Sequence, residues 1–145
     1  MNNFYITTPI YYVNDKPHIG HAYTTIACDI ISRYQKLLGN NVFFLTGTDE
    51  HGQKVEKAAL TNNINPKKFV DLMSNDFKNL VPYLNCNIND FIRTTESRHI
   101  KATQALWIKL LNNNQIYLSN YEGWYSIRDE AFYQENELIK NNNEF

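Results

Sequence analysis

The sequence has little cysteine, little glycine and no long apolar run: its 145 residues include two cysteines, five glycines and four prolines. Cys28 and Cys86 lie far apart and outside any CxxC pair, so we expect free thiols rather than a disulfide framework. No apolar run approaches the ~18 residues of a membrane span. The residues after Met1 carry no signal-peptide pattern. We therefore expect a cytoplasmic protein without a membrane partner.

The sequence also lacks an excess of charge of either sign: 14 basic residues and 15 acidic residues give a net charge of −1. A domain that binds nucleic acid through its own surface usually carries a basic patch. If a nucleic acid is a partner, we expect the basic surface to lie elsewhere. The hydrophobic fraction of 43% and the aromatic fraction of 14% are those of a globular chain. The length fits one domain.

The hydrophobic pattern alternates between strands and helices. Residues 4–8 predict a strand, 18–38 a helix with apolar stripes, and 42–45 a strand covered on both faces. These three elements form a βαβ unit with parallel strands. Further elements are expected in this order: helices at 53–61 and 66–80, a strand at 90–94, a helix at 96–113, and short strands at 116–118, 124–126 and 131–133.

The first polar cluster, His18 to His21, follows the first predicted strand and begins the first predicted helix. Backbone N–H groups at a helix start suit phosphate, and two imidazoles add hydrogen-bond donors for a transferring phosphate. Gly20 leaves room for a flat ring to pack on the backbone. Two alternatives remain: the histidines only cap the helix, or they hold a metal, for which no third ligand is nearby.

The second polar cluster, Asp49-Glu50-His51, follows the second predicted strand. Ligands of open α/β sheets bind at the carboxyl ends of strands, where both clusters are expected. A carboxylate there can hold an ammonium group. The alternative is an acidic turn that caps the next helix. The segment from Pro9 to Tyr12 forms an apolar rim after the first strand, for which ordinary core packing is the competing interpretation.

Three segments together resemble the N-terminal part of the catalytic domain of methionyl-tRNA synthetases, a family of class I aminoacyl-tRNA synthetases. HIGH-like histidine motifs occur throughout class I, whereas the longer strings are more specific. The matching segments are Ile6-Thr7-Thr8-Pro9-Ile10-Tyr11-Tyr12 with Asn14 and Pro17-His18-Ile19-Gly20-His21-Ala22-Tyr23; Phe43-Phe44-Leu45-Thr46-Gly47-Thr48-Asp49-Glu50-His51-Gly52; and Tyr121-Glu122-Gly123-Trp124-Tyr125 with Asp129-Glu130-Ala131-Phe132-Tyr133.

The resemblance implies an α/β fold that is the first half of a Rossmann-like (HUP-type) nucleotide-binding domain, over residues 1–115. Residues 116–145 would begin a small β-containing connective insertion. The implied activity is ATP-dependent activation of methionine, with Mg accompanying the ATP, and transfer to tRNA-Met.

The same resemblance assigns roles to particular residues. His18 and His21 would be catalytic and contact the ATP phosphates, with Gly20 under the adenine and His51 beside the nucleotide or the amino acid. Asp49 would bind the methionine ammonium. The methionine pocket would also include three residues after the first strand: Pro9, Ile10 and Tyr12.

The sequence departs from the family pattern in two ways. It contains no KMSKS loop and no anticodon-binding domain, so we expect the isolated chain to be inactive and to self-associate through surface left uncovered. Ser126 and Asp129 stand where many members have zinc-binding cysteines, and we expect no zinc or other metal. The alternatives are another class I aminoacyl-tRNA synthetase or a non-catalytic binding module derived from one.

Overall fold

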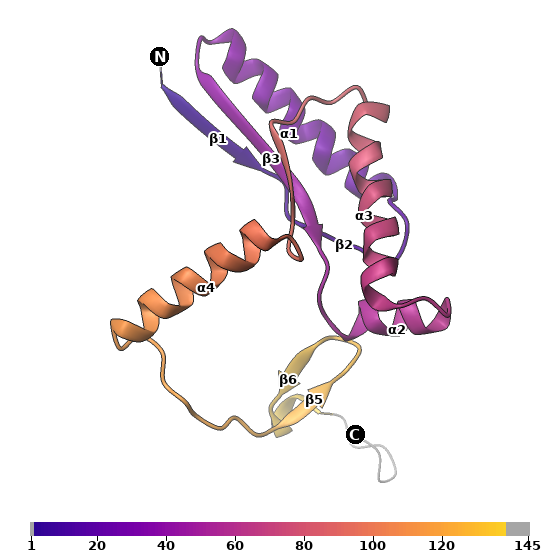
Figure 1. Ribbon diagram of the computed structural model, residues 1–145, viewed down its shortest axis with the longest axis vertical. Coiled ribbons are helices and arrows are strands. Elements are labelled where there is room, and N and C mark those ends of the chain that lie inside the picture. Colours follow the sequence, from indigo (N-terminus) through magenta and orange to yellow (C-terminus); the bar gives the residue numbers. More distant parts are fainter. Residues whose placement is uncertain (1, 139–145) are drawn as a thin grey trace. The chain divides into compact units, whose positions relative to one another are not determined.

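A computed structural model describes residues 2–138 of the chain (Figure 1). The chain divides into two compact units, Met1–Ala105 and Leu106–Phe145. Across the described residues no helix combines the length and apolar character needed to cross a membrane.

The first unit is built on a parallel sheet whose central strand is β3 (Asn41–Asp49). Strands β1 (Asn3–Thr7), β2 (Tyr11–Tyr12) and β4 (Asp90–Arg93) all pair with it in parallel. Leu45 is opposite residues of both β1 and β4, and Thr48 is opposite residues of both β2 and β4. Strand β4 therefore lies on the edge of β3 opposite to β1 and β2, and the predicted parallel α/β architecture is confirmed.

The described part of the chain has four α-helices: α1 (Ile19–Leu37), α2 (Gln53–Thr61), α3 (Pro66–Tyr83) and α4 (Ser97–Asn112). Helices α1, α2 and α3 lie in the connections between strands, and α4 follows the last strand of the sheet. Helices α1 and α3 cover the same face of the sheet, since His21 of α1 and Phe77 of α3 contact each other and Tyr11 of β2 (Figure 1). Successive right-handed crossovers that proceed in one direction produce this arrangement.

The covered face of β3 explains the core. Val42, Phe44, Thr46 and Thr48 alternate along the strand and are all buried, as expected for side chains that point to one face. On the other face Tyr5 and Phe43 contact each other, with ring centroids 5.9 Å apart, and remain 62% and 45% exposed. The prediction that this strand is covered on both faces is therefore wrong for the described residues.

Helix α1 differs from its expected packing. Its buried residues are polar, namely Thr25, Asp29 and Ser32, whereas large apolar residues of the predicted stripe are exposed, including Ile30 and Tyr34 at 61% and 58%. Asp29 is satisfied by Arg33 Nε at 2.5 Å and by a backbone N–H of the α3–β4 connection. The apolar period identified the helix correctly but not the face that these residues bury.

Gly47 fixes the spacing of β3 and β4. A Cβ at this position would lie 2.0 Å from the carbonyl oxygen of Ile92, a distance that backbone cannot accommodate. Glycine is required here because the two strands approach closely at the end of the sheet where the polar clusters lie.

The second unit contains the end of α4, a hairpin of β5 (Trp124–Ser126) and β6 (Ala131–Tyr133), and the 3-10 turn η1 (Glu135–Glu137). The two strands of the hairpin match the predicted ranges. The strand predicted at 116–118 is absent from the structure, which has no regular element there.

Candidate active site

A one-residue bulge opens the sheet edge between β1 and β2. Thr7 is opposite Leu45 and Tyr11 is opposite Thr48. The chain therefore advances four residues from β1 to β2 while β3 advances only three. Pro9 lies in the extra segment, and its lack of an N–H explains why the ladder is interrupted there. Bulges of this kind redirect backbone and side chains at the ends of sheets.

The bulge is anchored by a buried pair of hydroxyls. Thr8 Oγ1 lies 2.6 Å from Thr46 Oγ1 and donates to the carbonyl oxygen of Pro9 at 2.8 Å. Pro9 and Ile10 are consequently held out from the sheet and are exposed. Strand pairing then places Tyr12 directly opposite Asp49 at the carboxyl end of β3. Two residues predicted for one pocket are thus neighbours across the sheet.

His18 and His21 form a reciprocal cap at the start of α1. His18 is the N-cap, and its Nδ1 accepts from the backbone N–H of Gly20 at 3.1 Å. His21 Nδ1 in turn accepts from the backbone N–H of His18 at 3.1 Å. The capping alternative considered for these residues is therefore real. This capping engages only the Nδ1 atom of each imidazole ring.

The caps determine which ring nitrogens are free. A backbone N–H can only donate, so both Nδ1 atoms must be unprotonated acceptors. The ring proton of each neutral imidazole is therefore on Nε2, which neither cap engages. The cap at the beginning of α1 thus leaves the Nε2–H of each histidine available as a donor for a ligand.

Gly20 allows this arrangement. A Cβ there would lie 2.9 Å from His18 Cε1 and 3.1 Å from its Nδ1. A side chain at this position would force the His18 ring to shift from its capping position.

An aromatic support lies beneath the histidines. The rings of His18 and His21 have centroids 3.9 Å apart, and His21 packs edge-on against Tyr11 at 4.8 Å and Phe77 at 4.9 Å. Burial, followed by the nearby His18, lowers the pKa of His21 below its ordinary value of 6.5. Burial also raises the pKa of Tyr11 above its ordinary value. The local environment therefore favours a neutral His21.

At the second cluster, the three consecutive residues have different surroundings. Asp49 is half-buried, Glu50 is buried and His51 is exposed. The N-cap of α2 is Gly52, and no side chain caps this helix, so the acidic turn does not cap it. Glu50 instead forms an ion pair with Arg93 at the end of β4.

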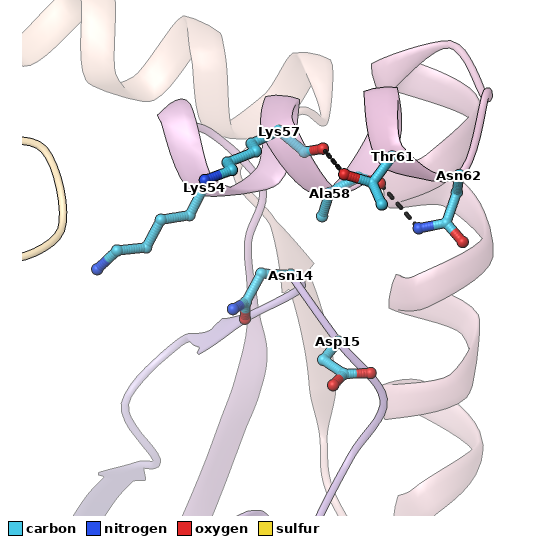
Figure 2. A pocket seen from close by; sticks show the side chains of 7 residues that line it. All are labelled: Asn14, Asp15, Lys54, Lys57, Ala58, Thr61 and Asn62. Carbon is cyan, nitrogen blue, oxygen red and sulfur yellow. Dashed lines mark hydrogen bonds between the residues drawn. The ribbon is translucent and has the colours of Figure 1, made fainter.

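A hollow of about 420 Å³ lies between α2 and the segment that follows β2 (Figure 2). Most of the residues that line it have polar side chains, among them Asn14, Asp15, Lys54 and Lys57. Figure 2 shows the aliphatic stem and amine of Lys54 extending away from Asn14. None of the predicted site residues lines this hollow.

The structure brings together His18 with His21, and Tyr12 with Asp49. His51 and Pro9 lie on exposed segments at the same end of the sheet. Sequence reasoning missed the supporting roles of Phe77 and Arg93, which become apparent only from contacts between segments distant in the sequence. Among residues 2–138, no group of three or more His, Cys, Asp or Glu side chains is placed to hold a metal ion.

Comparisons with known proteins give a consistent result. The family described as tRNA synthetases class I (M) matches residues 4–142. The methionine–tRNA ligase of Rickettsia bellii (strain RML369-C) is 61% identical over 137 residues, which are 94% of this chain and 27% of that protein. The chain thus spans about a quarter of the length of this relative.

Two solved structures share the fold. Methionyl-tRNA synthetase of Mycobacterium tuberculosis, in complex with methionyl-adenylate, matches with a TM-score of 0.89 and 44% identity, over 94% of this chain and 27% of that one. LeuRS of Agrobacterium radiobacter K84, in a ternary complex with tRNA and LeuAMS, matches with a TM-score of 0.75 and 22% identity, over 89% and 17%. The second match bears on the fold alone.

Proposed function

Because this chain belongs to the class I (M) family of tRNA synthetases, we propose that it supplies the first half of the adenylate-forming site of a methionine–tRNA ligase. The observation that carries this proposal is the pair of histidine Nε2–H donors at the start of α1, at the same end of the sheet as Asp49. The relative of known structure that binds methionyl-adenylate supports the same ligand for this site.

The proposed chemistry joins methionine to ATP. The methionine carboxylate attacks the α-phosphorus, a new P–O bond forms, and the bond to the β-phosphate oxygen breaks so that pyrophosphate leaves. The transition state carries extra charge on the phosphate oxygens, and His18 and His21 donate to them. No protein nucleophile is required, so positioning and charge stabilisation account for the rate.

The remaining roles follow from position. Asp49 holds the methionine ammonium, and its neighbour Tyr12, with Pro9 and Ile10, lines part of the methionine pocket. Because an apolar wall discriminates only ~1–3 kcal/mol per methylene, several such contacts are needed.

The nucleotide is proposed to lie along the start of α1. Gly20 brings the backbone close to the adenine, and His51 lies beside the nucleotide. Mg enters with the ATP, and tRNA-Met binds to the complete cytoplasmic protein. Residues 1–115 form the half-domain and 116–145 the beginning of the connective insertion.

We further propose that the hairpin of the second unit binds no zinc. Ser126 Oγ donates to Asp129 Oδ2 at 2.8 Å, and the backbone N–H of Asp129 donates to Ser126 Oγ at 3.2 Å. These hydrogen bonds close the turn between β5 and β6 with a neutral hydroxyl, which does not replace a thiolate ligand.

The isolated chain is proposed to be inactive and prone to self-association. Within residues 2–138, nothing covers the face with Tyr5 and Phe43 or the outer edge of β1, and these surfaces, with the exposed apolar residues of α1, are of the kind that associate. In a protein of the relatives' length, the remaining polypeptide would cover them.

The test is methionine-dependent exchange of pyrophosphate into ATP. This chain is joined to the part of the Rickettsia bellii ligase that follows the matched region; we call the product the joined enzyme. We expect exchange with methionine but not with leucine, valine or cysteine, and none from the chain alone. Exchange with a different amino acid would support another class I enzyme. A folded joined enzyme without any exchange would favour a non-catalytic module.

A further inference from the structure

The carboxylate of Glu50 is the most enclosed charged group at the carboxyl end of the sheet. Its side chain is 0% exposed, although it lies between Asp49 and His51, two residues of the proposed site. Four hydrogen bonds reach it. Arg93 donates from Nε to Oε1 at 2.6 Å and from Nη2 to Oε2 at 2.9 Å, Thr48 Oγ1 donates to Oε1 at 2.8 Å, and the hydroxyl of Thr95 donates to Oε2.

The backbone N–H of Glu50 is held as well. The N–H of Glu50 donates to Thr94 Oγ1 at 2.9 Å, so its main chain and side chain are both bound to residues at, or just after, the end of β4. Burial alone would raise the pKa of Glu50, but the hydrogen bonds from Arg93, Thr95 and Thr48 outweigh it and hold the pKa below its ordinary value. The group is thus a permanently charged anchor at neutral pH.

The anchor extends to α3. Arg93 Nη2 also donates to Asp71 Oδ1 at 2.5 Å. Thr48 gives its only hydroxyl proton to Glu50, so the contact of 3.1 Å between Thr48 and Ser74 must be a hydrogen bond donated by Ser74. Two strand ends and one helix therefore meet at a single buried carboxylate.

We infer that the fork between Arg93 and Glu50 is a positioning device that sets the orientation of Asp49 towards methionine. The inference rests on the proposed function. Alternate residues of an extended segment point to opposite sides, so fixing Glu50 on the buried side fixes Asp49 on the other. Neither Glu50 nor Arg93 needs to touch substrate, and both act through the backbone that they hold.

The discriminating variant is Arg93→Lys in the joined enzyme. Lysine keeps the positive charge beside the buried carboxylate but cannot make the two-point fork. If Arg93 only balances the charge of Glu50, the enzyme tolerates this change. If the two-point fork orients Asp49, the enzyme does not tolerate it. Displacing a binding group by about 1 Å costs on the order of 100-fold in rate. We therefore expect the KM for methionine to rise by about 10-fold or more while the KM for ATP changes by less than about twofold.

A matched control exists at the other end of β4, where Arg98 of α4 reaches back to the strand. Arg98 makes a comparable fork onto Asp90, from Nη1 to Oδ2 at 2.5 Å and from Nη2 to Oδ1 at 3.0 Å, but at the start of β4 and exposed. Arg98→Lys should leave both KM values unchanged. Equal effects of the two variants, or an Arg93→Lys enzyme with unaltered KM for methionine, would overturn the inference.

Folding is monitored by thermal unfolding of each variant. If Arg93→Lys does not fold, Glu50→Gln is used, because the amide keeps the shape of the carboxylate but has only one oxygen that can accept from Arg93, so the two-point fork is lost. A selective rise in the KM for methionine supports the inference there too, and no rise refutes it. Failure of the unsubstituted joined enzyme to exchange pyrophosphate would instead refute the proposed function, so the two outcomes are distinct.

Discussion

Replacement of His18 by asparagine in the joined enzyme should lower kcat for adenylate formation about 100-fold to 1,000-fold, the usual cost of losing one preorganised donor to a developing charge. Asparagine is among the best N-cap residues, so it can accept from the N–H of Gly20 as His18 Nδ1 does. Its shorter side chain has no donor at the place of Nε2. The cap is kept and the proposed donor is lost.

The complementary variant is His18→Gln, whose amide nitrogen reaches approximately as far as imidazole Nε2. Glutamine should recover part of the lost kcat even if it caps the helix less well. Steady-state exchange kinetics and thermal unfolding measured on both variants separate the two roles. The assignment fails if asparagine retains full activity, because capping would then account for the residue.

The same geometry predicts a pH dependence. His21 must be unprotonated at Nδ1 to accept from the N–H of His18, and its pKa lies below the ordinary value of 6.5. In the unfolded chain the imidazole takes up a proton first as the pH falls. The stability that the neutral ring contributes is therefore complete above about pH 6.5 and is lost as the pH decreases towards the folded-state pKa. Thermal unfolding between neutral and mildly acidic pH should show this loss, and His21→Asn should reduce it.

Removal of the Asp49 carboxylate should weaken methionine binding with little effect on ATP. A hydrogen bond to a charged group contributes ~1.5–3 kcal/mol, which corresponds to about a 10-fold to 100-fold rise in KM for methionine with Asp49→Asn. Asparagine has the same shape as aspartate, so the packing beside Tyr12, its partner across the sheet, is preserved. The measurement is the KM for each substrate in pyrophosphate exchange.

The control for this variant is Asp90→Asn. Asp90 is also an aspartate on a parallel strand, but it lies at the opposite, amino-terminal end of β4 and is engaged by Arg98. Its replacement should affect stability without changing either KM. If Asp49→Asn leaves the KM for methionine unchanged, the ammonium is bound by another group.

The sequence pattern predicted the local elements well because each has a local cause. Helix α3 begins at Pro66, as predicted, and Asn65 caps it by accepting from the N–H groups of Lys67 and Lys68. The two hairpin strands and α2 have their expected bounds. The short β2 was missed, because its pairing depends on a bulge that is defined only by the register of β1 and β3.

Burial was harder to predict than secondary structure. The apolar stripe of α1 contains Ile30 and Tyr34, which remain exposed, and the helix buries Asp29 instead. That choice depends on a partner in the α3–β4 connection, 58 residues away in sequence, which no local period reveals. In the same way, Glu50 stands in a motif of obvious interest, but its role depends on Arg93 at the end of another strand.

The roles assigned to site residues stay predictions, since strand ends show where a ligand can bind and not which atoms it contacts. The most direct test is a crystal structure of the joined enzyme with a non-hydrolysable analogue of methionyl-adenylate. We predict Nε2 of His18 or His21 within about 3.2 Å of a phosphate oxygen and the Asp49 carboxylate within about 3.2 Å of the ammonium. An analogue bound away from the start of α1, or with its ammonium held by another residue, would contradict this account.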